Sequence, residues 1–414
     1  MQFVTTIFIV ALILAFLLEF WLDQRQIRHV LANRGQVPGE FADRISLAEH
    51  QKAADYTVAR TRFGSVNQIV GVIILLMWTL AGGIDLLDHV WRGLGFNSVV
   101  TGVGVMLSVL LISALVELPL SAYRTFYIEQ RFGFNNSSLG LFIGDAVKQT
   151  VLTLLIGTPI LLLVLWLMQH MGGLWWLYVW AVWMGFSLLM LWAYPAFIAP
   201  LFNKFSPLEN TDLRTRIENL LKRCGFTSNG IFIMDGSRRS SHGNAYFTGL
   251  GKNKRIVFFD TLLNSLEPEE TEAVLAHELG HFKHKHIQKR IFSMAVMTLI
   301  GLAILGYIMQ QESFYTGLGV SQPSQYAALL LFMMVAPLFS IYLQPVFSWF
   351  SRKHEFEADS FAAQQSNAAR LIQALVKLYK ENASTLTPDP LYSAFHDSHP
   401  PAPVRIAHLA TSSR

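Results

Sequence analysis

The five residues from His277 to His281 have the residue types and the spacing of a metal-dependent hydrolase. They read His-Glu-Leu-Gly-His, and we expect the stretch around them to be helical. Residues four apart share one face of a helix, so His277 and His281 can hold one metal ion between them. Glu278 follows His277 directly and can reach a water that the metal activates. Two imidazole ligands and a carboxylate general base predict a catalytic zinc, whereas two surface histidines on a polar helix are the simpler alternative.

The segment Ser351–Asp359 offers a third protein ligand, which a catalytic zinc usually needs. Glu355 and Asp359 are four apart and share a helix face, so Glu355 can complete a His-His-Glu set. Asp359 can then accept a hydrogen bond from a ligand imidazole and fix its tautomer. His354 and Glu357 are rivals on other faces of this helix. An ordinary charged run beside a membrane anchor would have the same composition.

The helices that must position these candidate ligands belong to a chain with several membrane-spanning segments. Only 14% of the 414 residues are charged, against about 25% in soluble proteins. Seven apolar runs reach the length of about 20 residues that a bilayer crossing requires. They lie near 3–22, 66–86, 98–120, 150–170, 174–198, 290–310 and 326–349.

The basic residues between these runs indicate the orientation of the chain. With alternating crossings, Arg92 is the only Lys or Arg in the loops of one side. The excess on the other side predicts an N-terminus outside, and an active site and C-terminus in the cytosol. The pI of 9.1 follows from this asymmetry and from contact with the lipid bilayer, so we expect no nucleic-acid partner. The one cysteine, Cys224, allows no disulfide framework and is expected to pack.

We expect four parts along the chain. One of the expected cytosolic loops, 121–149, is rich in aromatic and charged side chains. This composition suits a position at the membrane surface or against the catalytic domain, and an ordinary connecting loop fits equally well. The four parts are 1–199 with five crossings and the cytosolic loops 23–64 and 121–149, 200–289 as a cytosolic metalloprotease insert, 290–350 with two crossings, and 351–414 as the cytosolic segment that completes the zinc site.

Within the insert, a short sheet and two helices are expected. Thr211 can cap a helix over Leu213–Arg223, which Gly225 would stop. Strands are predicted at 231–234, 245–248 and 255–259. A helix opening at Glu267-Pro268 carries the histidine motif and ends in the basic run 283–286.

Six segments that follow one another over most of the chain carry a more specific pattern. They are 123–129 with 133–135, 244–249, 252–263, 277–281, 355–359 and 398–401. Together they resemble the integral-membrane zinc CAAX prenyl endopeptidases, the type I CAAX proteases related to the yeast a-factor converting enzyme. The resemblance implies a mainly α, polytopic fold, with seven transmembrane helices around a chamber and a gluzincin-type protease domain with a small β-sheet.

The resemblance also implies roles for single residues. His277, His281 and Glu355 would bind one Zn²⁺ per chain, and Glu278 would be the general base. Asn244 would contact the substrate backbone or the reacting centre, and His399 would donate to the oxyanion. The ordinary alternatives are a turn at Asn244, a tail residue at His399, and His396 as an equally available imidazole.

A peptide strand would have a place to bind under this interpretation. An extended substrate beside Ala245, Tyr246 and the two residues that follow would add a strand to the sheet edge, with its scissile carbonyl at the metal. An Asn or His donor aimed at the developing oxyanion could contribute about 2.7–4 kcal/mol.

The sequence therefore predicts a monomeric zinc metalloendopeptidase that cleaves membrane-associated or C-terminally lipidated peptides from the cytosolic side. A prenyl group on the substrate is the family expectation. An HtpX-like quality-control protease is the near alternative, and a non-proteolytic transporter or scaffold with a vestigial metal site is the distant one. Short outer loops, the lack of a retrieval signal and the weakly apolar run Ala402–Arg405 favour a bacterial cytoplasmic membrane, with the endoplasmic reticulum membrane expected for a eukaryotic chain.

Overall fold

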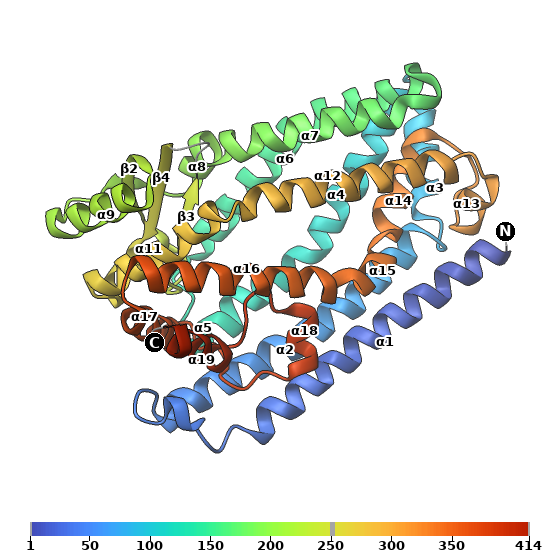
Figure 1. Cartoon of the computed structure of the whole chain (residues 1–414). Coiled ribbons are helices and arrows are strands. Elements are labelled where there is room, and N and C mark those ends of the chain that lie inside the picture. Colours follow the sequence, from blue (N-terminus) through green and yellow to red (C-terminus); the bar gives the residue numbers. More distant parts are fainter. Residues whose placement is uncertain (1, 249–252, 413–414) are drawn as a thin grey trace.

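The computed structural model of the chain describes residues 2–248 and 253–412 and consists mainly of long helices (Figure 1). Seven helical stretches among the described residues are long and apolar enough to cross a membrane, which confirms the number expected. They are 2–32, 47–78, 98–132, 139–170, 172–202, 286–308 and 325–365. Most extend well beyond the length that a bilayer requires, so the same helices continue into the polar part of the molecule.

The helices of the membrane body are α1 (Gln2–Ala32), α2 (Leu47–Trp78), α3 (Gly83–Gly93), α4 (Ser98–Tyr123), α5 (Gln130–Phe132), α6 (Leu139–His170), α7 (Trp175–Ala193), α8 (Ala199–Phe202), α12 (His286–Ile308), α13 (Glu312–Gly317), α14 (Gln325–Val335) and α15 (Pro337–Ser340). Two π-helical turns, η2 (Arg124–Glu129) and η4 (Tyr194–Ile198), continue α4 and α7. The 3-10 turns are η1 (Gly39–Phe41), η3 (Gly172–Leu174), η5 (Gly236–Arg238) and η6 (Ile341–Leu343).

The polar end holds α9 (Thr211–Cys224), α10 (Asp260–Ser265), α11 (Pro268–Lys283), α16 (Gln344–Gln365), α17 (Ala368–Glu381), α18 (Pro390–His396) and α19 (Ala402–Ser412). The last crossing stays helical through α14, α15, η6 and α16. Glu355 therefore stands on the continuation of a membrane helix.

Local sequence signals set the ends of the helices near the site. Helix α11 begins at Pro268, as the proline and acids there predict, and Glu267 caps it through a capping box with Glu270. The expected cap of α9 is wrong by one residue, because the side chain of Asn210 rather than Thr211 accepts the bond from Leu213 N. The expected end of the following helix in the basic run 283–286 is confirmed, because α11 ends at Lys283. Lys285 takes a left-handed conformation with φ 57°, which ends the first helix and lets His286 begin α12.

A four-stranded sheet forms the insert, in the order β1-β2-β4-β3. The strands are β1 (Phe205–Pro207), β2 (Thr227–Met234), β3 (Ala245–Thr248) and β4 (Asn253–Phe259). The three expected strands are present, and the sequence missed β1. Strands β2 and β4 are parallel, and the other two pairs are antiparallel. Strand β3 is thus an end strand in the described part of the sheet.

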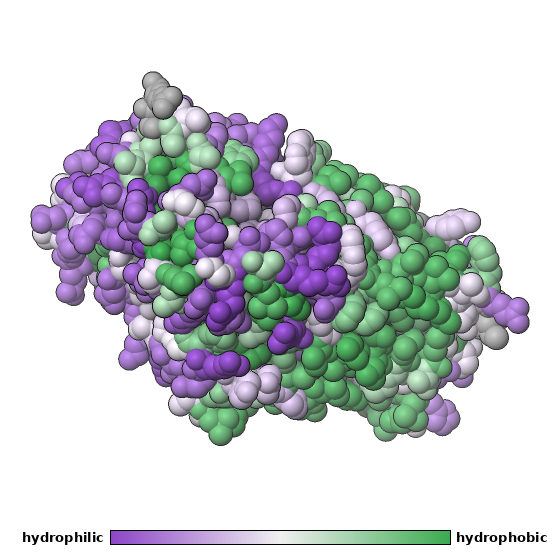
Figure 2. Space-filling model, turned by 90° about the horizontal axis from the view of Figure 1, so that it is seen from below, coloured by the Kyte–Doolittle hydropathy of each residue, from purple (hydrophilic) through white to green (hydrophobic). Residues whose placement is uncertain are grey.

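The two halves of the molecule differ in what their surfaces expose (Figure 2). Membrane helices leave large apolar side chains accessible, such as Phe292 at 71%, which suits contact with lipid. In the insert, Ile217, Phe258 and Leu275 are fully buried in a core that joins α9, the sheet and α11. This core fixes α11 and thereby the direction in which its histidines point.

The aromatic and charged segment 121–149 contacts the insert, so it packs on the catalytic domain and is more than an ordinary connecting loop. Asn135 forms a β-bridge with Ser240. The Asn136 N–H donates to the Arg239 carbonyl at 3.0 Å, and Arg239 Nε lies 2.7 Å from Asp145 Oδ2. The two ends of the described chain lie at opposite ends of the molecule (Figure 1).

Candidate metal site

The metal-binding motif is assembled where α11 crosses α16. The crossing is close because Gly280 of α11 lies against Ala358 of α16, and a Cβ at residue 280 would stand 2.8 Å from the Ala358 Cα. A larger residue would force the helices apart. The close approach brings His277 and His281 to Glu355, and these three residues form the only group of potential metal ligands found among the described residues.

The three ligand atoms have the separations that a zinc ion requires. His277 Nε2 lies 3.2 Å from His281 Nε2, and the Glu355 carboxylate faces both nitrogens, with Oε2 at 3.4 Å from the first and Oε1 at 3.3 Å from the second. Tetrahedral bonds of about 2.0–2.1 Å would place neighbouring ligand atoms about 3.3 Å apart. The Glu355 Oε2 atom is also buried without a hydrogen-bond partner among the described residues. Its charged neighbours, His277 Nε2 at 3.4 Å and Arg405 Nη1 at 3.7 Å, leave it free to bond a metal, so the donor set fits a metal.

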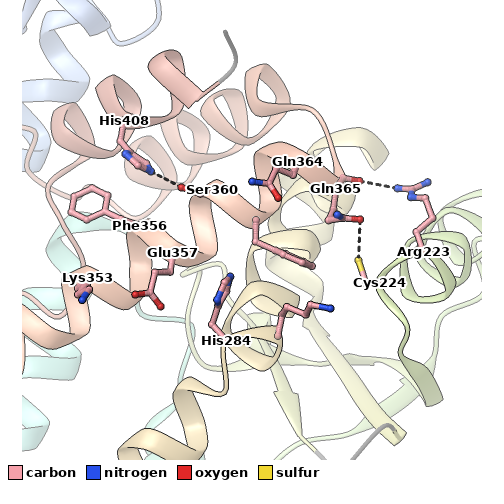
Figure 3. Close-up of a pocket in the computed structure, with 12 residues that line it drawn as sticks. Arg223, Cys224, His284, Lys353, Phe356, Glu357, Ser360, Gln364, Gln365 and His408 are labelled. Carbon is pink, nitrogen blue, oxygen red and sulfur yellow. Dashed lines mark hydrogen bonds between the residues drawn. The ribbon is translucent and has the colours of Figure 1, made fainter.

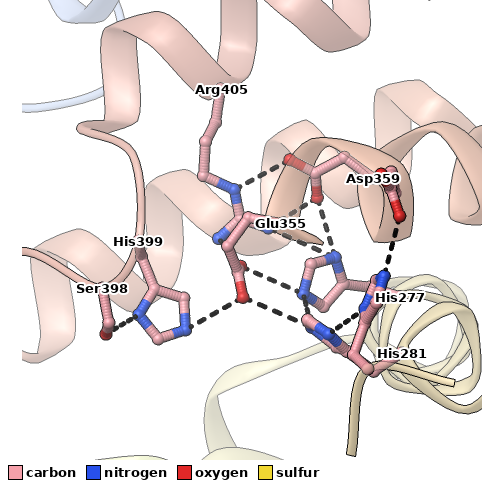
Figure 4. A network of polar contacts seen from close by, with 9 residues as sticks. His277, His281, Glu355, Asp359, Ser398, His399 and Arg405 are labelled. Atoms are coloured by element: carbon pink, nitrogen blue, oxygen red, sulfur yellow. Dashed lines mark hydrogen bonds and ion pairs between the residues drawn. The ribbon is translucent and has the colours of Figure 1, made fainter. Parts of the chain in front are cut away.

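The side of the His277 ring away from this centre is held by a buried ion pair (Figure 4). His277 Nδ1 lies 2.8 Å from Asp359 Oδ1, and Asp359 is fully buried. Arg405 of α19 donates from Nε to Asp359 Oδ2 at 2.9 Å. The pair holds His277 in the tautomer whose Nε2 is free to bind a metal.

The charge of His277 follows from these neighbours. Burial disfavours the protonated imidazole, but the hydrogen bonds to Asp359 and Glu355 outweigh burial and raise the pKa of His277 to about 9. A metal must displace that proton when it binds to Nε2.

His399 approaches the site from the segment between α18 and α19. Its Nε2 atom lies 3.5 Å from Glu355 Oε1, and Ser398 Oγ lies 2.9 Å from its Nδ1 atom (Figure 4). The side chain is 61% exposed because it borders a cavity of about 760 Å³. Desolvation lowers the pKa of His399 and favours the neutral ring.

The other expected site residues lie on α11 and at the start of β3. Glu278 is half-buried on α11, and no hydrogen bond of its carboxylate is recorded within the described chain. Asn244 is exposed just before β3, where its side chain accepts from the Ala245 N–H at 2.8 Å. Ala245 and Tyr246 belong to β3 and pair with β4.

The alternative site candidates from the sequence lie outside the group of three ligands. Glu357 contacts His286, the ring of His354 stacks on His286, and His396 lies 3.3 Å from Glu19. Glu357 also lines a second cavity, of about 550 Å³, between α9, α11, α16 and α19 (Figure 3).

Sequence reasoning missed Arg405, which stood out only as a departure from an apolar run. It is 6% exposed and pairs with Asp359. The spacing between Arg405 and His399 in the sequence could have identified Arg405 as a site residue. Arg405 lies on α19 six residues after His399, in a run where a charge needs a partner.

Comparisons with known proteins agree with this architecture. Residues 26–204 match the family model described as CAAX prenyl protease N-terminal, five membrane helices, and residues 207–413 match peptidase family M48. The CAAX prenyl protease 1 homolog of Arabidopsis thaliana is 35% identical, with 95% of both chains covered. CAAX prenyl protease 1 of Saccharomyces cerevisiae is 34% identical, with 95% of this chain and 92% of the relative covered.

A solved structure has the same fold. The crystal structure of S. mikatae Ste24p superposes with a TM-score of 0.91 at 33% identity, and covers 98% of each chain. These relatives are eukaryotic, so the bacterial origin stays a prediction. The full-length matches favour a CAAX-type protease over the HtpX-like and transporter alternatives. The chain belongs to peptidase family M48 and is a membrane metallopeptidase of the CAAX prenyl protease group.

Proposed function

We propose that the resident metal is one zinc ion per chain, bound by His277 Nε2, His281 Nε2 and Glu355. The separations of these atoms and the buried Glu355 oxygen that accepts no hydrogen bond among the described residues support this assignment. Zinc would supply Lewis acidity for the scissile carbonyl and make water at the site more acidic.

Glu278 is the proposed general base. It follows His277 on α11 and is half-buried. Its carboxylate makes no hydrogen bond to another residue of the described chain. It takes a proton from the attacking water and passes it to the leaving amine.

His399 is the proposed oxyanion donor. The Ser398 hydroxyl can donate to Nδ1 of His399, which leaves the proton of the neutral ring on Nε2, the atom that faces Glu355. The N–H group is then directed at the region where the scissile carbonyl must lie. This tautomer supports a donor role at neutral pH.

The proposed substrates are peptides or proteins with a lipidated C-terminal segment. Strand β3 can take up an extended peptide at its open edge, with Asn244, Ala245 and Tyr246 as contacts. The cavity beside His399 is lined by polar residues of α1 and α2, two membrane helices, and so connects the site with the membrane body. The relatives in Arabidopsis thaliana and Saccharomyces cerevisiae are named CAAX prenyl proteases, which agrees with this substrate class.

We also propose a monomer with its N-terminus outside and its active site in the cytosol, and we retain the four-part division of the chain. The odd number of crossings among the described residues and the opposite positions of the two ends support termini on opposite sides of the membrane, and the excess of basic residues in the other loops favours the cytosol for the active site.

The triad of His277, His281 and Glu355 is the observation that carries the proposal, and peptide cleavage tests it. Purified wild type should cleave a farnesylated CAAX peptide faster than its unlipidated twin. Glu278→Ala should lower kcat by about 100-fold or more while zinc stays bound, as expected for loss of a general base. Activity that survives both Glu278→Ala and a zinc chelator would contradict the catalytic assignment. Equal cleavage of both peptides would contradict lipid selectivity.

A further inference from the structure

The ring of His281 is held by a second histidine on its side away from the metal centre. His281 Nδ1 lies 2.9 Å from Nδ1 of His286, the first residue of α12. His286 is 5% exposed, and its Nε2 atom lies 2.9 Å from Glu357 Oε2. The contacts form a continuous row from α11 through α12 to α16.

The positions of the protons in this row follow from its two ends. If Nε2 of His281 binds the metal, the proton of His281 lies on Nδ1 and is donated to Nδ1 of His286. His286 must then be neutral, with its own proton on Nε2, and it donates that proton to the Glu357 carboxylate. Each ring nitrogen in the row is then either a donor or an acceptor, so the row favours the tautomer of His281 with its proton on Nδ1.

Other contacts hold the middle of the row in place. The His354 ring stacks on His286, with centroids 4.0 Å apart and an interplanar angle of 16°. Lys289 Nζ lies 3.7 Å from Glu357 Oε2 and compensates its charge. The left-handed turn at Lys285 brings His286 back toward the end of α11.

The two ligand histidines are therefore supported in parallel ways. His277 donates directly to Asp359, whose charge Arg405 compensates. His281 reaches Glu357 through an inserted imidazole. The carboxylates come from alternate residues of α16, with the third ligand Glu355 preceding both.

We propose that His286 and Glu357 are positioning residues that orient His281 for metal binding through a row of hydrogen bonds. This inference rests on the proposed function, in which His281 Nε2 binds zinc. The row also explains why a histidine is buried at residue 286 and why Glu357 stays outside the ligand set.

Zinc affinity of the full-length, detergent-solubilised chain tests the role of His286. His286→Phe keeps an aromatic ring against His354 and removes both hydrogen bonds. It should weaken zinc binding about 10–100-fold, the usual effect of removing such a support. His354→Phe is the matched control, because it also replaces an imidazole by a ring of similar size, but it keeps the stacking on His286 and removes neither hydrogen bond of the row. It should stay within about threefold of the parent.

A double-mutant cycle tests whether Glu357 acts through His286. Glu357→Gln should weaken zinc binding about tenfold in the parent and have almost no effect in the His286→Phe background. An equal loss of zinc affinity from Glu357→Gln in both backgrounds would overturn the proposed role of the row. The proposal would also be overturned if His286→Phe bound zinc as tightly as the control. If His286→Phe does not fold, Glu357→Gln alone decides, since its side chain is 30% exposed. An unchanged affinity would then overturn the inference.

The visible spectrum of the Co²⁺-substituted protein adds a readout that mere destabilisation would not change. His286→Phe should shift the ligand-field bands, and His286→Asn, which can keep an acceptor near His281, should restore part of the parent spectrum. Identical spectra for the parent and His286→Phe would contradict the positioning role. A parent chain that binds no zinc would instead contradict the proposed function itself.

Discussion

His277 is a buried imidazole whose protonation is controlled by the carboxylates around it. In the metal-free chain its pKa is raised to about 9, so the proton occupies the ring throughout the neutral range. The stabilising effect of the charged ring is fully present below the ordinary pKa of 6.5, and it is lost as the pH rises through about 9.

Zinc binding should therefore release close to one proton from His277 at pH 7.5, and the apparent affinity should rise about tenfold per pH unit up to about pH 9. Proton release in weakly buffered solution and competition with a chelator of known pH dependence measure both quantities. An affinity that is the same at pH 7 and pH 8.5 would contradict the assigned proton.

Arg405 should be essential for stability even though it binds no metal in the proposed site. Arg405→Leu removes the guanidinium from Asp359, which is fully buried and then keeps only its contact with the His277 ring as a charged neighbour. Removing one partner of a buried pair costs about 3–5 kcal/mol, which denaturation of the zinc-free protein can measure. Arg214→Leu, at an exposed position of α9, is the control and should be nearly neutral.

Adding Asp359→Asn to Arg405→Leu should recover part of the loss, since the unpaired charge is then gone. A double variant that is no more stable than Arg405→Leu would show that the ion pair is not the reason for its effect.

At the scale of elements, the crossing of α11 and α16 decides whether three ligands meet. Gly280→Ala would place a methyl group against the Ala358 backbone, at a cost of about 1–3 kcal/mol if the helices keep their positions. We expect the helices to separate slightly and zinc affinity to fall about tenfold or more. Gly144→Ala in α6 is a matched control, because nothing lies within 4 Å of the added carbon. Unchanged zinc affinity in Gly280→Ala would show that the close approach does not matter.

The sequence predicted the helix of the histidine motif and the strands that flank it, because periodicity, capping signals and turn residues are local. It also predicted that Glu355 and Asp359 share a face, since residues four apart do so on any helix. It could not predict that Arg405 and His286 join them. Both residues come from elements whose packing depends on long-range contacts, and α12 begins at His286 only because Lys285 is left-handed.

At the scale of the whole molecule, the apolar runs and the asymmetry of basic residues predicted seven crossings, and the helices confirm that number within the described chain. The cavity beside His399 could not be predicted, because it is lined by residues of α1, α2 and the segment after α17, which meet only in the folded chain. The sequence likewise left open whether 121–149 packs on the insert, since aromatic residues suit both a membrane surface and a protein face.

The proposed orientation can be measured by thiol labelling in a chain whose only cysteine is removed by Cys224→Ala. In sealed vesicles with the cytosolic face inward, an impermeant reagent should label Gln322→Cys and should not reach Asp212→Cys. Both positions are exposed, and detergent should make both reactive. Labelling of Asp212→Cys in sealed vesicles would reverse the orientation.

The most direct test of the account is anomalous diffraction from crystals of the zinc-loaded chain, measured on both sides of the zinc absorption edge. We expect one peak per chain, within bonding distance of His277 Nε2, His281 Nε2 and the Glu355 carboxylate. A peak at other residues, or zinc-loaded crystals with no anomalous signal between α11 and α16, would contradict it.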